Sequence, residues 1–266
     1  MAGRRSARSV SAGALGAVSK IPVVTIWFWL VKVMITGADV AWPDYLYRHL
    51  GQVVASGMIC AVLIGALAVQ FRARCYRAWV FWPAAVAVSL AGTEAANGVH
   101  VELGLSYLAV GLLYFVLLIA LMAWWRAREG TLSLRRIDSV PREAFFWAAA
   151  LAAGALGTAI AHLSGVVVPG GLAGPWTWAA LTGCVAVAWW RFGLDPVLAF
   201  WSCYVLTRPL GTSIALRLAA GQRAGGPGLG QWPVTAGLAV GVVIVVTYLA
   251  ISRRDVLGPG IAAVPP

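Results

Sequence analysis

Residues 200–215 read FWSCYVLTRPLGTSIA, and this stretch decides the fold of the chain. In it a Phe-Trp pair is followed, after nine intervening residues, by Gly-Thr and then, two residues further on, by Ala. The same spacing begins at Phe81 and at Phe146, and a divergent copy begins at Phe28, where Asp39-Val40 replaces Gly-Thr. One spacing that recurs along a chain indicates an internal structural repeat.

The composition around this repeat excludes a soluble enzyme. Of 266 residues, 61% are hydrophobic and only 11% are charged, with a mean hydropathy of +0.84, whereas soluble domains carry about 25% charged residues. A helix needs about 20 apolar residues to cross a bilayer. Eight stretches reach this length: Ile21–Val40, Leu50–Phe71, Ala78–Val99, Leu103–Trp125, Glu143–Leu163, Gly171–Trp190, Val197–Ala219 and Trp232–Ser252.

Each Phe-Trp pair lies near the start of an odd-numbered stretch, so one repeat is a pair of helices. The sequence therefore predicts an all-α integral membrane protein with eight transmembrane helices, arranged as four parallel two-helix repeats. The repeats cover about 21–71, 78–125, 143–190 and 197–252. Their Phe residues are 53, 65 and 54 residues apart, which indicates two four-helix halves. Residues 1–20 and 253–266 are expected to be tails around one membrane domain, 21–252.

Lys and Arg residues decide the expected orientation. Fifteen of the twenty lie in the tails and in alternate turns, against three in the other loops. Because cytoplasmic loops are enriched in Lys and Arg, both termini are expected in the cytoplasm. This bias towards cytoplasmic loops explains the net charge of +11, so no nucleic-acid partner is expected. The four cysteines do not have the spacing of a metal site.

Polar residues recur at fixed distances from each Phe. Helical residues four apart lie on nearly the same face, and positions 8, 12 and 16 form one stripe. In the order of the four repeats, position 8 is Thr36, Ser89, Gly154 and Arg208. Position 12 is Val40, Thr93, Thr158 and Thr212, and position 16 is Asp44, Asn97, His162 and Leu216. Lipid cannot satisfy such groups, so the stripes are expected to face a common centre.

Arg208 should have an acidic partner at this depth, and Asp39 and Glu94 are the two candidates. The residues leave open whether Arg208 forms a structural ion pair or contacts a solute. Asp44, Asn97, His162 and Thr158 could together hold a cation. For the Gly-Thr pairs close helix packing is favoured over solute contact. Lys32 is expected to extend to the cytoplasmic edge. The candidate binding residues are Asp39, Asp44, Thr93, Glu94, Asn97, Thr158, His162, Arg208 and Thr212.

The segments Leu206–Gly211 and Glu143–Trp147 carry a resemblance to a known family. Over about residues 20–250 the chain resembles bacterial multi-pass "membrane-anchored proteins" of uncharacterised activity, built from a short membrane repeat of unknown function. The resemblance implies a bacterial inner-membrane location and four Asp residues, one ending each stripe. Only Asp44 is present here, with Asn97, His162 and Leu216 at the other three positions.

The stripes favour a transporter or permeation protein for a small polar or ionic solute. The alternative is a non-transporting scaffold or signalling partner, in which the polar residues serve helix packing. No nucleophile and base are paired, so an enzyme is not expected; no cofactor is expected either. The expected partners are the bilayer and the solute, and the sequence gives no oligomeric state.

Overall fold

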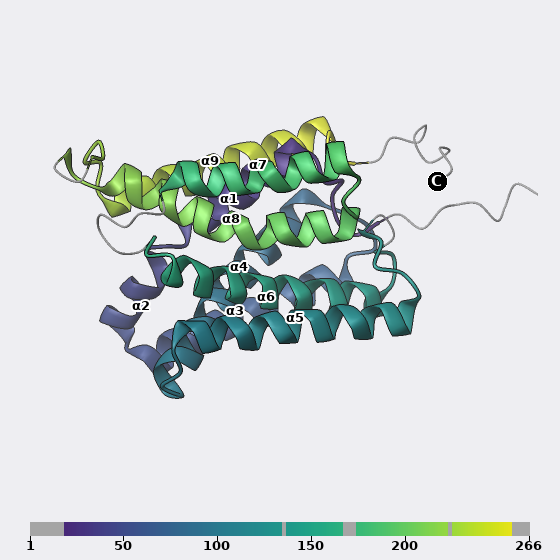
Figure 1. The fold of residues 1–266 in the computed structure, drawn as a ribbon, viewed down its shortest axis with the longest axis horizontal. Coiled ribbons are helices and arrows are strands. Elements are labelled where there is room, and N and C mark those ends of the chain that lie inside the picture. Colours follow the sequence, from purple (N-terminus) through teal and green to yellow (C-terminus); the bar gives the residue numbers. More distant parts are fainter. Residues whose placement is uncertain (1–18, 135–136, 167–173, 223–224, 257–266) are drawn as a thin grey trace, which may run out of the picture.

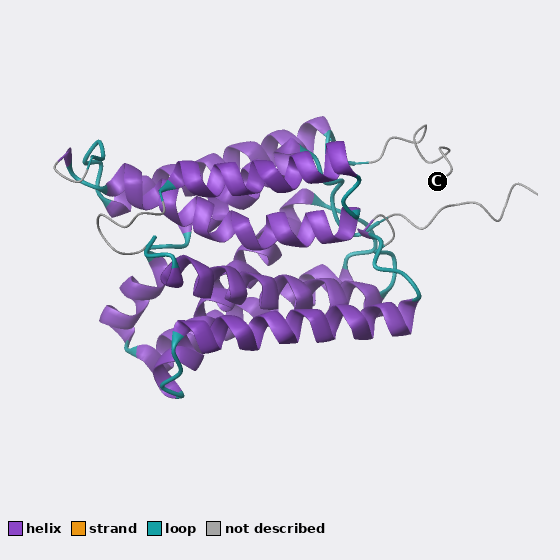
Figure 2. Cartoon of the chain, in the orientation of Figure 1, coloured by secondary structure: helices purple, strands orange, loops and turns teal. Residues whose placement is uncertain are grey.

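In the computed structural model, residues 19–134, 137–166, 174–222 and 225–256 are described, and within these ranges the regular structure is entirely helical (Figure 1, Figure 2). The helices are α1 (Ile26–Ala38), α2 (Trp42–Leu50), α3 (Gln52–Arg72), α4 (Ala78–Glu102), α5 (Tyr107–Glu129), α6 (Val140–Leu163), α7 (Pro175–Phe192), α8 (Pro196–Ala219) and α9 (Gln231–Ser252). All except α2 run side by side between the two ends of one bundle (Figure 1).

Four helices form the centre of the bundle and four lie around them. In the centre α1 packs on α8, α8 on α6 and α6 on α4, while α4 touches α1 only slightly. Each surrounding helix packs on the central helix that follows it in the chain: α3 on α4, α5 on α6 and α7 on α8. The last helix, α9, packs on α1 and so returns the chain to its first helix.

Apolar side chains differ sharply between the two sets. Central helices bury small residues such as Ala149 and Ala153 of α6, whereas surrounding helices expose large ones such as Ile64 and Phe115. Four helices (α3, α5, α6 and α9) are long and apolar enough to cross a membrane. An exposed belt of large apolar side chains is a lipid-facing surface. The chain is a helical membrane protein.

The four Phe-Trp pairs form a closed ring, which we call the aromatic ring. Each Phe contacts the Trp of the next central helix, and the last Phe contacts the first Trp. The ring-centroid distances are 5.6 Å for Phe28–Trp82, 5.2 Å for Phe81–Trp147, 6.0 Å for Phe146–Trp201 and 5.5 Å for Phe200–Trp29. All four pairs lie in the first turns of α1, α4, α6 and α8, so these helices begin at one end of the bundle. That end, with the α5–α6 loop, lies at the right of Figure 1, and α2 lies at the left.

Two features of the first repeat differ from the sequence expectation. The predicted span Ile21–Val40 is a shorter helix, Ile26–Ala38, and the unpredicted helix α2 follows it. Helix α2 carries Asp44, Arg48 and His49 among aromatic residues, and is amphipathic rather than apolar. A search for continuous apolar runs cannot find such a helix.

Candidate functional site

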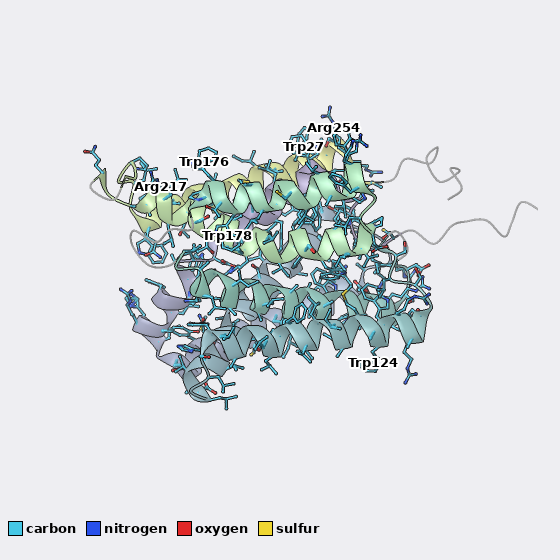
Figure 3. All side chains as sticks on the ribbon, viewed as in Figure 1. Trp27, Trp124, Trp176, Trp178, Arg217 and Arg254 are labelled. Carbon is cyan, nitrogen blue, oxygen red and sulfur yellow. The ribbon has the colours of Figure 1, made fainter. Side chains whose placement is uncertain are left out.

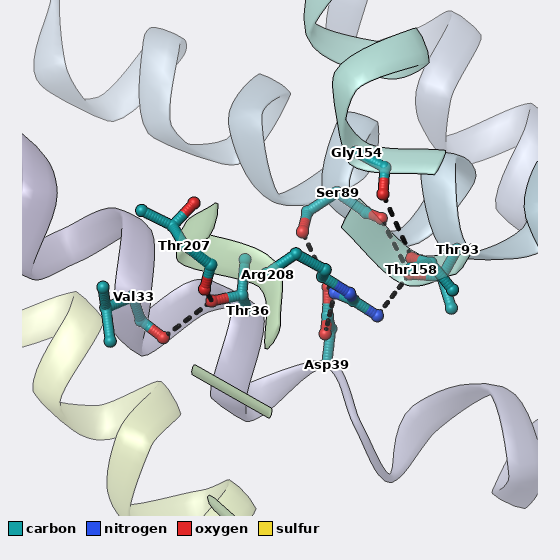
Figure 4. Close-up of polar contacts among 9 residues, drawn as sticks. All are labelled: Val33, Thr36, Asp39, Ser89, Thr93, Gly154, Thr158, Thr207 and Arg208. Atoms are coloured by element: carbon teal, nitrogen blue, oxygen red, sulfur yellow. Dashed lines mark hydrogen bonds and ion pairs between the residues drawn. The ribbon is translucent and has the colours of Figure 1, made fainter. Parts of the chain in front are cut away.

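Arg208 and Asp39 form an ion pair in the middle of the central helices, which we call the core pair (Figure 4). The Arg208 guanidinium donates from Nη1 to both carboxylate oxygens of Asp39 and from Nη2 to Thr93 Oγ1. Ser89 Oγ donates to Asp39 Oδ2 over 2.7 Å. Arg208 is 5% exposed and Asp39 is 3% exposed. Asp39, and not Glu94, is therefore the partner of Arg208.

The repeat explains why a carboxylate lies at this point. Asp39 is eleven residues past its Phe, the position that Gly92, Gly157 and Gly211 hold in the other repeats. A Cβ on Gly157 would lie 2.7 Å from the Val205 carbonyl oxygen, so these glycines let neighbouring helices meet backbone to backbone. The first repeat lacks the glycine, and its helix touches α4 only slightly. The core pair fills this looser α1/α4 interface.

Most stripe hydroxyls bond backbone carbonyls. Thr158 Oγ1 donates to Gly154 O over 3.1 Å, and Thr36 Oγ1 lies 2.9 Å from the Thr207 carbonyl oxygen of α8. Thr93 Oγ1 donates to Ser89 O and accepts from Arg208. Thr212 is buried. The prediction that the stripe threonines face inward is confirmed, but only Thr93 belongs to the core pair.

Glu94 joins a different group. Its carboxylate accepts hydrogen bonds from Tyr47 of α2 and Ser56 of α3, so it ties both helices to α4. Glu94 is partly exposed, and it lies one residue beyond Thr93 towards the α2 end.

The third layer of the stripe meets at Tyr107. The Tyr107 hydroxyl donates to Asn97 Oδ1 over 3.2 Å, and the ring stacks 4.1 Å from His162 and 4.0 Å from His100. Asp44 lies in α2, and its side chain is outside the described part of the structure. Asn97 and His162 of the expected cation site thus meet at one side chain, while Thr158 bonds within its own helix. The site as a whole includes Asp44 and so stays a prediction.

Lys32 contradicts its sequence expectation. Its side chain does not extend to an edge of the bundle but is 3% exposed, with Nζ 4.3 Å from the centre of the Tyr204 ring. Because Lys32 is buried inside the central helices, it joins the candidate site residues. It was not among the residues predicted from the sequence. Ser89 was omitted too, although position 8 of the stripe already pointed to it.

A second buried ion pair, the end pair, was not predicted. Lys20 Nζ lies 2.7 Å from Glu143 Oε2 and donates to the Phe71 carbonyl over 3.2 Å. Gln70 Nε2 donates to Glu143 Oε1 over 2.7 Å. Lys20 falls in a predicted tail, but it links the segment before α1 to α3 and α6 near the aromatic ring.

The segment before α1 and the segment after α9 meet at the same end of the bundle. Tyr76 donates a hydrogen bond to Asp255, whose backbone carbonyl accepts from Val23 N over 2.9 Å. Burial raises the pKa of the Asp255 carboxyl above its usual value, while the Tyr76 hydrogen bond opposes this shift. Asp255, like Lys20, falls in a predicted tail and is buried.

An apolar cavity of about 530 Å³ opens between α7 and α8, away from the core pair. Its lining includes Trp176, Leu210, Ile214 and Arg217. Trp176 and Arg217 lie towards the surface and the α2 end of the bundle (Figure 3). With an almost wholly apolar lining, this cavity offers no set of polar groups comparable to the core pair.

Comparison with known families finds one match. Residues 199–255 match the family described as "Repeat of Unknown Function (DUF347)". No curated protein and no solved structure matches the chain. The matched residues hold nearly all of α8, with Arg208, and the whole of α9. The last repeat of this chain is therefore similar to a repeat of a family that is itself uncharacterised.

Proposed function

We propose that the chain carries a small polar or ionic solute across a bacterial inner membrane, with the core pair as the place where the solute binds. In this proposal eight helices span the bilayer as four parallel two-helix repeats, and both termini lie in the cytoplasm. The cyclic packing of α3, α5, α7 and α9 on the next central helix supports the repeat arrangement. Lys and Arg near the aromatic-ring end support the orientation.

The observation that carries the proposal is the core pair itself. A charge at the centre of a membrane helix costs at least roughly 2.5–3.5 kcal/mol, and an apolar pair of similar volume is often no less stable. Arg208 and Asp39 are nevertheless placed where α1, α4 and α8 meet. Charged groups within a membrane are most often functional.

The short first helix supports access from the α2 end. Helix α1 ends beside Asp39, whereas α4 continues ten residues beyond Gly92, its equivalent position, or about 15 Å. The extra length of α4 carries the polar residues Glu94 and Asn97, which are both partly exposed. At the other end the aromatic ring closes the centre. This arrangement fits a carrier closed on its cytoplasmic side.

Flux through proteoliposomes tests the proposal. Purified protein is reconstituted and assayed with metal cations, protons and small anions; we expect flux of one class, and its loss in Arg208→Met and in Asp39→Asn. The control is Arg72→Met, because Arg72 is an exposed cation at the end of α3. Absence of flux for every solute, or full flux in Arg208→Met, would contradict the proposal.

Cysteine accessibility gives a second test. In a background without Cys60, Cys75, Cys184 and Cys203, a water-soluble thiol reagent should modify Thr93→Cys, which lies at the core pair. The same reagent should leave Thr158→Cys and Thr212→Cys unmodified, because these positions pack against backbone or neighbouring helices. Equal protection of all three would remove the case for a water-accessible site.

One set of contacts favours a non-transporting scaffold instead. The Thr36 and Thr158 hydroxyls bond backbone carbonyls, and the three repeat glycines bring helices into close contact. These are packing roles. Under this alternative Arg208→Met lowers stability alone, wild-type proteoliposomes show no flux, and a partner protein co-purifies with the chain.

A further inference from the structure

Lys32 is a buried cation without a matching carboxylate. Four charged residues of the central helices and their caps are buried in the described part of the chain: Lys32, Asp39, Glu143 and Arg208. Asp39 pairs with Arg208, and Glu143 pairs with Lys20. The contact recorded for Lys32 is with the Tyr204 ring, at 4.3 Å. A cation–π contact offsets only part of the cost of burying an ammonium group.

Asp39 attracts the Lys32 ammonium, but it forms no ion pair with Lys32, and the Arg208 charge opposes the attraction. Both Asp39 oxygens already accept from Arg208, and Oδ2 accepts from Ser89 as well. Asp39 is also seven residues from Lys32 on the same helix, about 10 Å along its axis. Lys32 thus lies between two layers, with the core pair on one side and the aromatic ring on the other.

The aromatic ring, whose Phe28 lies one helical turn before Lys32, contains indole donors without a partner among the described residues, and Trp125 and Trp178 outside the ring carry such donors too. The buried indole nitrogens Nε1 of Trp147 and Trp201 have no hydrogen-bond partner in the described structure. The Trp201 ring lies 5.5 Å from the Tyr204 ring, which in turn carries the Lys32 ammonium. An ammonium and an indole N–H can only donate. Buried polar groups normally find a partner, so a ligand for this layer must supply acceptors.

We infer that the layer around Lys32, Tyr204 and Trp201 binds a small inorganic anion. An anion supplies both the negative charge that Lys32 lacks and the acceptor that the indole N–H lacks. This layer is a second binding place beside the core pair. The inference rests on the proposed function for the step of transport and names its substrate class, while the binding itself can be measured without flux.

Thermal unfolding of the purified full-length protein in detergent tests the binding. The salts are sodium bromide, nitrate, acetate and gluconate at one ionic strength. A bound ligand stabilises the folded state in proportion to the logarithm of its concentration, so bromide and nitrate should each raise Tm by roughly 3 °C for every tenfold increase above Kd. Gluconate should have no effect. Stabilisation by acetate alone would overturn the inorganic-anion assignment, and equal Tm in all four salts would overturn the site.

Two variants separate binding from packing. In Lys32→Met the response to bromide should vanish, and Tm in gluconate should equal or exceed that of the wild type, because an unpaired buried charge has been removed. A purely structural Lys32 predicts the opposite: a lower Tm in every salt. The matched control, Arg72→Met, should keep the full bromide response.

Trp201→Phe keeps an aromatic ring but removes the N–H, and it should weaken bromide binding several-fold. In a bromide-soaked crystal, the anomalous signal should lie in contact with Lys32 Nζ; a signal elsewhere, or an unchanged Kd in Trp201→Phe, would overturn the site. If bromide binds but proteoliposomes carry no solute, the anion site stands and the transport proposal fails. If proteoliposomes carry a cation and bromide does not change Tm, the transport proposal stands and the anion site fails.

Discussion

The core pair and the end pair, both buried in the described part of the chain, differ in what surrounds them. The end pair, Lys20–Glu143, is completed by Gln70 and by the Phe71 carbonyl, close to the chain ends and loops. The core pair, Arg208–Asp39, is completed by the hydroxyls of Ser89 and Thr93 in the middle of the bundle. The first ties a chain terminus to the bundle. The second links α1, α4 and α8 in the middle of the bundle, at a depth where apolar packing alone would suffice, and this difference is what the proposed function rests on.

The largest expected effect concerns the core pair. Arg208→Met leaves Asp39 buried without a counter-ion, and removing one partner of a buried pair costs about 3–5 kcal/mol. The double variant Arg208→Met with Asp39→Asn removes both charges and should regain most of this stability. Solute flux should stay absent in both variants. Unfolding in detergent and flux in proteoliposomes measure the two properties, and flux restored together with stability would assign the pair to structure.

The end pair should affect stability but, unlike the core pair, should not affect flux. Glu143→Gln leaves the Lys20 ammonium with the Phe71 carbonyl but without a carboxylate, and we expect a loss of about 2–3 kcal/mol. Lys20→Met combined with Glu143→Gln should recover part of it. Flux per folded molecule should equal that of the wild type in both variants. A specific loss of flux in Glu143→Gln, at unchanged protein level, would extend the functional site to this end.

A smaller effect tests the helix contacts that hold the core pair in place. A Cβ on Gly211 would lie 2.5 Å from the Val33 carbonyl oxygen, so Gly211→Ala must push α8 from α1, at a cost of about 1–3 kcal/mol. Because Arg208 is one turn away, flux should fall as well. Gly154→Ala is the matched control: its nearest contact would be Gly92 Cα at 3.8 Å, and we expect a change within about 0.5 kcal/mol. Equal losses would show that helix contact does not depend on these glycines.

The sequence predicted most of the helices because apolar residues dominate the central and surrounding helices, although only α3, α5, α6 and α9 are both long and apolar enough to cross a membrane among the described residues. It missed α2, whose Asp44, Arg48 and His49 interrupt any such run. It also placed Lys20 in a tail, since a basic residue after a Ser- and Gly-rich segment gives no sign of a partner 123 residues away.

Within the site, the sequence identified the layer but not every contact. Asp39 is eleven residues past its Phe and Glu94 is thirteen. Two residues turn a helix by about 200°, so the two carboxylates leave their helices in nearly opposite directions relative to the repeat. Hydroxyls such as Thr158 looked like lining groups, but they bond to their own helix. Lys32 could not be placed from its position, because a flexible side chain four residues from a helix start can turn either way.

The order in which the ribosome makes the helices matters for the core pair. Asp39 and Arg208 are 169 residues apart, and at about 5–20 residues per second the ribosome needs on the order of 10 s or more to make that length. If the first two-helix repeat inserts as proposed, it holds a carboxylate in the bilayer during this interval with no Arg208 to meet it. Biogenesis must therefore keep that repeat hydrated, protonated or sheltered by the insertion machinery until α8 emerges, and a chain cut before α8 would be left permanently in that state.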